Sequence, residues 1–438
     1  MLQDLIRDVK RLPRISAEGK IVALEGLRIE ASGPAVSLKV GALARIGSSH
    51  GARAEIVGFN GDLAILLACE TSDDIYPGAP VFFEAGAGYL NPCEGWLGRI
   101  VDPFGDPMDG GDKLPRGPYA KSVQAAPPPA HNRSRVDQRL HLGVRVMDLF
   151  TPCGKGQRLG LFAGSGVGKS TLMGMLAQGA DADVIVIGLI GERGREVREF
   201  VEDALGPSGL ARSVVVTATS DAPAPARRRA AYAALTVAEY FRDQGKQVLC
   251  LLDSVTRFAM AQREIGLAAG EPPTTRGYTP SVFAELPKLL ERAGPGQPGQ
   301  GDITGLFTVL VDGDDHNEPV ADAVRGILDG HIVMSRHIAE RGRYPAVDLL
   351  KSLSRLNSVL QGPDEAALVR EVRRLVSAYT DMEELIRIGA YSTGADADVD
   401  LAVRLMDGLN IFLGQSESDP TAPEAVIEGL KAVYEGSA

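Results

Sequence analysis

The sequence predicts an α/β fold, with a parallel β-sheet covered by helices on both faces, a small β-barrel before it and an all-helical domain after it. Three observations predict this fold. Short alternating stretches separated by glycine turns are typical of a small barrel. Apolar runs of strand length that alternate with helical stretches indicate a parallel sheet, and the last part of the chain is helical throughout. We expect an N-terminal amphipathic helix, the barrel, a linker, the central domain and the helical domain at residues 1–18, 19–90, 91–139, 140–361 and 362–438.

The composition excludes several classes of protein. The 46 Lys and Arg residues against 57 Asp and Glu residues give a net charge of −11, which argues against nucleic acid or an anionic membrane as the main partner. The four cysteines are far apart, the first residues lack the apolar core of a signal peptide, and no apolar run approaches the roughly 20 residues that span a bilayer. We therefore expect a cytoplasmic protein.

The first element is a short amphipathic helix that ends before Pro13. Its apolar residues recur at helical spacing, at Leu2, Leu5, Ile6, Val9 and Leu12. Two interpretations remain open for it. The helix either packs on its own domain or is a detachable helix that docks on a partner.

The barrel is predicted from strand-like stretches at residues 20–24, 36–40 and 64–68, with the turn Asn60-Gly61 between two of the strands. A turn-rich passage at residues 98–111 and three consecutive prolines then predict a crossing into the next domain.

The central domain contains four apolar runs of strand length, at residues 184–190, 213–219, 248–252 and 306–311. A long helix is predicted at residues 223–244, and the glycine density of residues 294–301 predicts an irregular loop. In the helical domain, one face carries Leu368, Val372, Leu375, Val376 and Tyr379.

Residues 158–172 predict a phosphate-binding loop, because an apolar strand breaks into a glycine-rich turn and then into helix-forming residues. The residues of the turn are Gly164, Ser165, Gly166, Val167, Gly168, Lys169, Ser170 and Thr171. Backbone N–H groups of such a turn point inward at phosphate, while the lysine and the serine hydroxyl serve phosphate and Mg²⁺. The strict pattern has glycine where this chain has Ala163. The alternative is an ordinary glycine turn before a helix.

Charged residues follow two of the predicted strands, at the sheet edge where ligands gather. Asp253 follows residues 248–252 and is a candidate for holding Mg²⁺, although such an acid can also be a helix cap. Glu192 follows residues 184–190 and could orient a water for attack on the terminal phosphorus, with Arg193 neutralising the phosphate oxygens. The alternative is a helix N-terminus with acids in its first turn. Arg257 lies one helical turn beyond Asp253, near the same phosphates if a helix begins there.

Residues 343–356 contain a third candidate group. Tyr344, beside Pro345, could stack on a base, and Arg355 could present its guanidinium outward. Spacing alone leaves the alternative of a core tyrosine and a surface arginine. The six histidines show no zinc-ligand spacing, and no nucleophile elbow is present.

Five motifs together resemble a known family. They lie at residues 162–170, 188–197, 253–263, 272–283 and 345–354. The chain resembles the catalytic subunits of rotary ATP synthases, and most closely the flagellar-type protein-export ATPases of bacterial type III secretion, from about Gly98 to about Gly394. The resemblance implies a P-loop NTPase with a RecA-like sheet.

The resemblance also implies roles for the site residues. It implies that Lys169 and Arg193 contact the terminal phosphates of ATP, that Ser170 and Asp253 serve Mg²⁺, and that Glu192 activates water. Arg257 would belong to the phosphate cluster.

Three further residues receive roles from the resemblance alone. Arg355 is implied to be an arginine finger donated in trans to the neighbouring subunit, and Tyr344 is implied to stack on adenine. Phe412 is a further candidate for the adenine pocket.

The implied function is Mg²⁺-dependent ATP hydrolysis by a homohexamer at the inner face of the cytoplasmic membrane, which energises protein export through a flagellar type III apparatus. The alternatives are the ATPase of a non-flagellar injection system and a platform that mainly docks chaperone-bound cargo. The implied partners are a stator-like regulator at the N-terminal helix, a central-stalk coiled-coil protein, the membrane export gate and chaperone–cargo complexes, with no nucleic acid among them.

Overall fold

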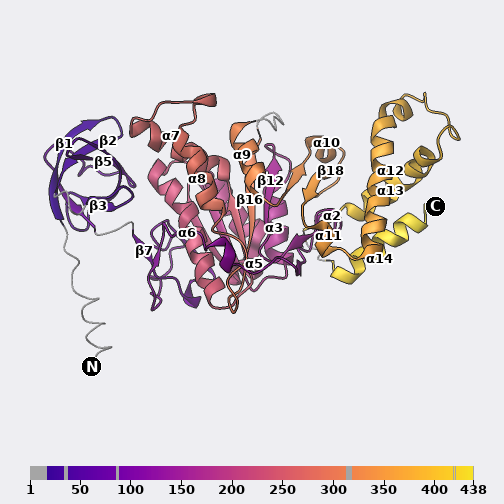
Figure 1. The fold of residues 1–438 in the computed structure, drawn as a ribbon, viewed down its shortest axis with the longest axis horizontal. Coiled ribbons are helices and arrows are strands. Elements are labelled where there is room, and N and C mark those ends of the chain that lie inside the picture. The colour runs from indigo at the N-terminus through magenta and orange to yellow at the C-terminus, as the bar shows by residue number, and fades with distance from the viewer. Residues whose placement is uncertain are drawn as a thin grey trace.

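The computed structural model describes residues 17–33, 38–84, 88–311, 318–417, 419 and 421–437. The predicted N-terminal helix lies outside these residues, apart from its last two positions, which belong to the first strand. Figure 1 shows three parts along the molecule, a barrel, a central sheet with its helices, and a group of C-terminal helices.

The first part is a closed six-stranded antiparallel barrel, which confirms the predicted barrel. Its strands are β1 (Ala17–Glu25), β2 (Arg28–Ser32), β5 (Leu63–Ala68), β4 (Ala52–Asn60), β3 (Leu43–Ile46) and β6 (Pro80–Phe83), in this spatial order. Gly61 has a φ of 57° in the turn between β4 and β5, where residues other than glycine are disfavoured. Of the stretch at residues 36–40, the described residues 38–40 form no strand, and exposed Val40 lies in a turn.

The central sheet has eight strands in the order β18-β17-β12-β16-β15-β13-β14-β8. The strands are β8 (Arg99–Val101), β12 (Arg158–Ala163), β13 (Val184–Ile190), β14 (Ser213–Ala218), β15 (Val248–Asp253), β16 (Ile303–Leu310), β17 (Gly330–Met334) and β18 (Val347–Ser354). All neighbouring pairs are parallel except β17 and β18, which are antiparallel. The predicted parallel sheet is therefore confirmed, with one antiparallel edge strand that the apolar pattern did not indicate.

The other edge strand, β8, comes from residues 91–139, which were predicted as a linker. It pairs in parallel with β14 through three residues. Prolines and glycines surround so short a strand, and its apolar signal is therefore too weak to stand out in the sequence.

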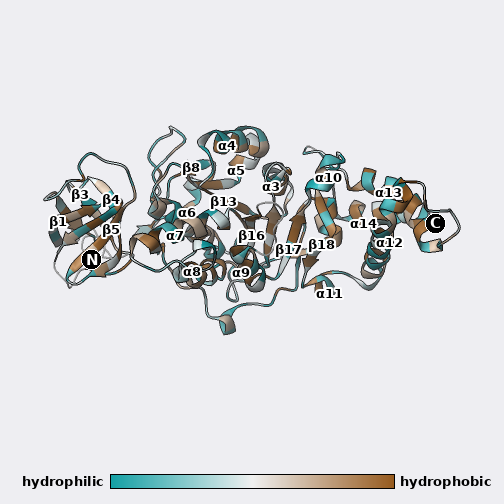
Figure 2. Cartoon of the chain, turned by 90° about the horizontal axis from the view of Figure 1, so that it is seen from above, coloured by the Kyte–Doolittle hydropathy of each residue, from teal (hydrophilic) through white to brown (hydrophobic). Residues whose placement is uncertain are grey.

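Helices cover both faces of the sheet. One face packs against α6 (Ala224–Asp243), α7 (Val255–Ala268), α8 (Pro280–Leu290) and α9 (Pro319–Ile327). The other packs against α2 (Arg145–Phe150), α3 (Lys169–Gly179) and a π-helical segment (Phe200–Leu205) that links α4 (Gly194–Glu199) to α5 (Gly206–Ala211). Figure 2 shows the central strands coloured as hydrophobic, as expected for strands that are buried on both faces.

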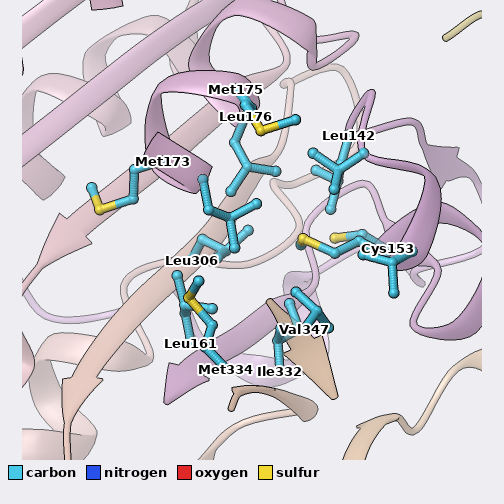
Figure 3. Close-up of a cluster of buried hydrophobic side chains, with 14 of the residues drawn as sticks. Leu142, Cys153, Leu161, Met173, Met175, Leu176, Leu306, Ile332, Met334 and Val347 are labelled. Carbon is cyan, nitrogen blue, oxygen red and sulfur yellow. The ribbon is translucent and has the colours of Figure 1, made fainter. Parts of the chain in front are cut away.

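The C-terminal helices are α12 (Pro363–Arg387), α13 (Ala397–Leu413) and α14 (Pro423–Glu435). Their buried residues, among them Val372, Leu405 and Leu430, belong to the same hydrophobic cluster as the α3 face of the sheet. Figure 3 shows part of this cluster, with Leu161 and Ile332 of the sheet on one side of it and Leu176 of α3 on the other. The helical domain therefore shares a core with the sheet.

Residues 294–301 form no helix or strand, but hydrogen bonds hold them near the end of α6. The Gly301 N–H donates to the Arg242 carbonyl at 2.9 Å, and the Gly296 N–H donates to Asp302 Oδ1 at 3.0 Å. Among the described helices, none combines the length and the apolar character needed to cross a membrane.

Candidate active site

The phosphate-binding loop joins the end of β12 to the start of α3. Gly166 and Gly168 have φ values of 78° and 88°, in the left-handed region that favours glycine. Ala163 is the last residue of β12, and its methyl group is buried in the core. The departure from the strict pattern therefore falls on a strand residue, outside the turn. Val167 is also buried, which anchors the tip of the loop.

The loop borders a cavity of about 440 Å³. Its lining comes from the loop, the first turn of α3, the segment after β13, the start of α7 and the end of β16, namely Ala163, Gly164, Ser165, Gly166, Gly168, Lys169, Ser170, Thr171, Glu192, Arg193, Glu196, Arg257, Leu310 and Val311. The carboxyl ends of β12, β13 and β15 meet at this edge because the three strands are parallel. The structure thus brings together the residues that the sequence placed after separate strands.

Lys169 lies between two carboxylates. Its Nζ is 2.5 Å from Asp253 Oδ1 and 3.7 Å from Glu192 Oε1. Asp253 is 3% exposed, and its Oδ1 also accepts a hydrogen bond of 2.6 Å from Thr308 Oγ1. Buried charges need such partners, because an isolated buried carboxylate is strongly unfavourable.

The carboxyl group of Glu192 has a raised pKa. Burial raises the pKa of its carboxyl group to about 7, and repulsion from Asp253 adds to this, while Lys169 and Arg257 act in the opposite direction. Its Oε1 is buried and accepts no hydrogen bond. A carboxyl group with a pKa near neutrality is suited to accept a proton from water.

Arg257 lies in the first turn of α7, directly beside the turn after β13. Ser254 caps this helix by accepting a hydrogen bond of 3.2 Å from the Arg257 N–H. A Cβ at Gly191 would lie only 3.2 Å from Arg257 Cβ, so this glycine gives the arginine room. The Arg257 Nε is buried and has no hydrogen-bond partner, so it is a donor available to an anion in the cavity.

Arg193 lies at the rim of the same cavity. Its side chain is 80% exposed and pairs with Glu196 at 3.3 Å. It must turn inward from this pair to reach a phosphate, whereas Arg257 is already in place.

The residues near Asp253 fit a magnesium ion that is held jointly with phosphate. Ser170 is exposed on the first turn of α3, and Asp253 supplies a carboxylate, so the donors are oxygens as Mg²⁺ prefers. In the described part of the chain, no group of three or more His, Cys, Asp or Glu residues could hold a metal without further ligands. The remaining ligands would have to come from nucleotide phosphates and water.

Tyr344 lies beside the loop. A Cβ at Gly168 would lie 3.4 Å from two of its ring carbons, and its side chain is 44% exposed. The Tyr344 carbonyl accepts a hydrogen bond of 2.8 Å from the Gln415 N–H. The ring of Phe412, in contrast, lies 5.6 Å from the Arg145 guanidinium and packs near Gly429 of α14, so its observed contacts do not bring it to the loop.

Arg355 lies where the parallel strands of the sheet begin, and the loop lies where they end. Arg355 follows β18, and its N–H donates to the Asp329 carbonyl at 3.0 Å, level with Arg158 at the start of β12. The six residues of β12 span roughly 20 Å. Within one chain, Arg355 is therefore too far from the cavity to contact a nucleotide there.

Sequence reasoning missed two residues near the site. Thr308 is one, and its hydroxyl within the apolar run at residues 306–311 was a usable signal. Arg336, whose guanidinium donates to the Ser165 carbonyl at 3.3 Å, gave no such signal, because α10 (Arg336–Glu340) reaches the loop only through the tertiary fold.

Comparisons with known proteins agree with this geometry. The model of the ATP synthase alpha/beta family, nucleotide-binding domain, matches residues 143–354, and the model of the T3SS EscN ATPase C-terminal domain matches residues 362–432. A protein of Caulobacter vibrioides named flagellum-specific ATP synthase is 55% identical over 430 residues, which cover 96% of each chain.

Two solved structures are also similar. The assembled ATPase EscN of the enteropathogenic E. coli type III secretion system aligns with a TM-score of 0.89 at 43% identity, over 95% of this chain and 100% of that one. EscN in complex with its central stalk EscO aligns with a TM-score of 0.87, at the same identity and coverage.

The raised pKa of Glu192 predicts a pH-dependent stability in the absence of nucleotide. The ionised form is disfavoured in the folded chain, so the contribution of Glu192 to stability falls as pH rises from its ordinary pKa of 4.5 to about 7. Between pH 5.5 and 8 the wild type should therefore lose stability relative to Glu192→Gln. Thermal unfolding checks this: as pH rises, the unfolding midpoint of Glu192→Gln should increase relative to that of the wild type. A difference between the two midpoints that does not change with pH would contradict the assignment.

Proposed function

Because this chain belongs to the ATP synthase alpha/beta family, and within it to the ATPases of type III export, we propose that it works as a Mg²⁺-dependent homohexamer. The chain is an ATP-hydrolysing enzyme of this export family. The observation that carries the proposal is the Lys169 ammonium, held between Asp253 and Glu192 beside the phosphate loop.

The phosphate loop would hold the β- and γ-phosphates of ATP through its backbone N–H groups. Lys169 would then exchange its carboxylate partners for phosphate oxygens, and the buried Nε of Arg257 would gain the acceptor that it lacks. Ser170 and Asp253 would hold Mg²⁺, which neutralises charge on the phosphates when bound.

Glu192 would position the attacking water and accept its proton. Its Oε1 accepts no hydrogen bond, and Lys169 lowers the pKa of this carboxyl group. When the phosphates attract Lys169 away, the Glu192 carboxylate would therefore become a stronger base toward the water. The water oxygen bonds to the γ-phosphorus as the bond to the ADP oxygen breaks, so ADP and phosphate are released.

Arg355 would complete the site of the neighbouring subunit. Its position at the far edge of its own sheet excludes contact with its own nucleotide, while its exposed side chain is available to another chain. The assembled state of the related EscN supports a ring in which this occurs. An arginine finger contributes about 10³ to 10⁵ in rate elsewhere, so a lone subunit should be nearly inactive.

We propose the flagellar apparatus as the site of action. The flagellum-specific relative is 55% identical, against 43% for EscN of an injection system. The EscN–EscO complex supports a central-stalk partner for this chain as well. The stator-like regulator at residues 1–12, the export gate, chaperone-bound cargo and a peripheral position at the membrane stay predictions.

A Glu192→Gln variant separates a motor from a docking platform. Turnover should fall by about 10² to 10⁴, because the general base is lost, while ATP binding persists. Glu199→Gln is the matched control, since this exposed acid of α4 forms an ion pair with Arg195 on the surface of the same helix. The motor function predicts that export of flagellar subunits falls together with turnover, and normal export without turnover would instead support the platform.

Complementation in mixed rings tests the arginine finger. Arg355→Ala and Lys169→Ala should each be inactive alone. If Arg355 acts in trans, about one quarter of the sites in a random mixture combine an intact loop with an intact finger, so turnover should recover to that order. A mixture that stays as inactive as its components would contradict the trans assignment, and Lys431→Ala, an exposed charge on α14, controls for the loss of a surface cation.

A further inference from the structure

Thr308 donates a hydrogen bond to the carboxylate that the proposed function assigns to magnesium. Its Oγ1 lies 2.6 Å from Asp253 Oδ1, and both side chains are almost fully buried. The contact follows from the order of the strands, because β16 lies directly between β15 and β12. Leu252 of β15 pairs with Phe307 of β16, and Leu161 of β12 pairs with Thr308 of β16. Thr308 is thus the residue of β16 that stands beside the end of β15.

The same carboxylate oxygen has a second donor, Lys169, whose Nζ lies 2.5 Å away. This lysine also belongs to the phosphate loop, so nucleotide phosphates compete with Asp253 for its ammonium. When Lys169 turns toward phosphate, Asp253 Oδ1 keeps one neutral donor, the Thr308 hydroxyl. A buried carboxylate that lost both donors would be neither oriented nor stabilised.

The backbone that carries Thr308 is itself fixed to the helix after Asp253. Two residues beyond it, the Leu310 N–H donates to Thr256 Oγ1 of α7 at 2.9 Å. Thr256 is 5% exposed, so this link is buried as well. The two threonines therefore tie the end of β16 to the segment 253–256 at two points.

We propose that Thr308 is a positioning residue for Asp253, which keeps Oδ1 oriented during nucleotide binding so that Oδ2 is presented to Mg²⁺ or to its water shell. This inference rests on the proposed role of Asp253 and adds the residue that holds it. Partners of this kind, one step removed from the metal, typically change metal affinity about 10- to 100-fold when they are lost.

The test compares two substitutions at Thr308. Thr308→Val keeps the shape and removes the hydroxyl, while Thr308→Ser keeps the hydroxyl. Calorimetry measures the affinity of each protein for ADP with and without Mg²⁺, which isolates the gain that the ion provides. We expect this gain to fall about tenfold in Thr308→Val and to stay within about twofold of the wild type in Thr308→Ser, with Mg²⁺-free ADP affinity unchanged in both.

Thr304→Val is the matched control. Thr304 lies on the same strand with the same burial, but its Oγ1 accepts from the Gly156 N–H at the other end of the sheet. The proposal would be overturned if Mg²⁺ increased the ADP affinity of Thr308→Val as much as that of the wild type. It would also be overturned if Thr304→Val lost as much of this increase as Thr308→Val. If Thr308→Val fails to fold, Thr308→Ala replaces it with the same expected outcomes.

Asp253→Asn separates this inference from the proposed function. If Asp253→Asn keeps the full Mg²⁺ gain, the assigned role of Asp253 is wrong. If Asp253→Asn loses the gain and Thr308→Val keeps it, the role of Asp253 stands and that of Thr308 is refuted.

Discussion

The site depends on one interaction, the buried ammonium of Lys169 between the carboxylates of Asp253 and Glu192. The two carboxylates repel each other: burial and Asp253 raise the pKa of Glu192, and Lys169 lowers it. The lysine offsets that repulsion in the absence of nucleotide, and phosphate then competes for it. We propose that binding of ATP draws Lys169 away from the carboxylates and makes Glu192 a stronger base toward water. The parallel order of β12, β15 and β13 makes this possible, because it brings three separate strand ends to one edge.

The sequence predicted this half of the site because its residues obey local rules. The loop residues, Glu192 and Asp253 each follow an apolar strand directly, and parallel strands end at a common edge. Residues outside that rule were harder to place. Thr308 lies within a strand, and the partner of its hydroxyl, Asp253 of the neighbouring strand β15, is known only from the fold. Strand β8 is too short to produce an apolar signal, and β18 pairs antiparallel through contacts that no local pattern encodes.

The pairing of β18 also decides what one chain can do alone. Because β18 runs back along β17, Arg355 emerges at the edge where the strands begin, and hydrogen bonds hold it there. The Gln157 side chain, fully buried, donates to Ser354 Oγ at 3.0 Å, and Arg158 pairs with Asp329, whose carbonyl accepts from the Arg355 N–H. Strand β12 therefore carries the phosphate loop at one end and supports the arginine at the other. We propose that one subunit thus contributes to two different sites, and a ring is the arrangement that would use both contributions.

The most direct test of this account is a structure of the assembled protein with ADP and a planar phosphate analogue such as aluminium fluoride. The account predicts that the Arg355 guanidinium of one subunit lies within hydrogen-bond distance, about 3 Å, of the analogue bound to the loop of its neighbour. In the same structure, Lys169 should contact the analogue and no longer Asp253. An Arg355 that stays remote from every bound analogue in an assembled, catalytically competent ring would contradict the claim that each site is completed by the adjacent chain.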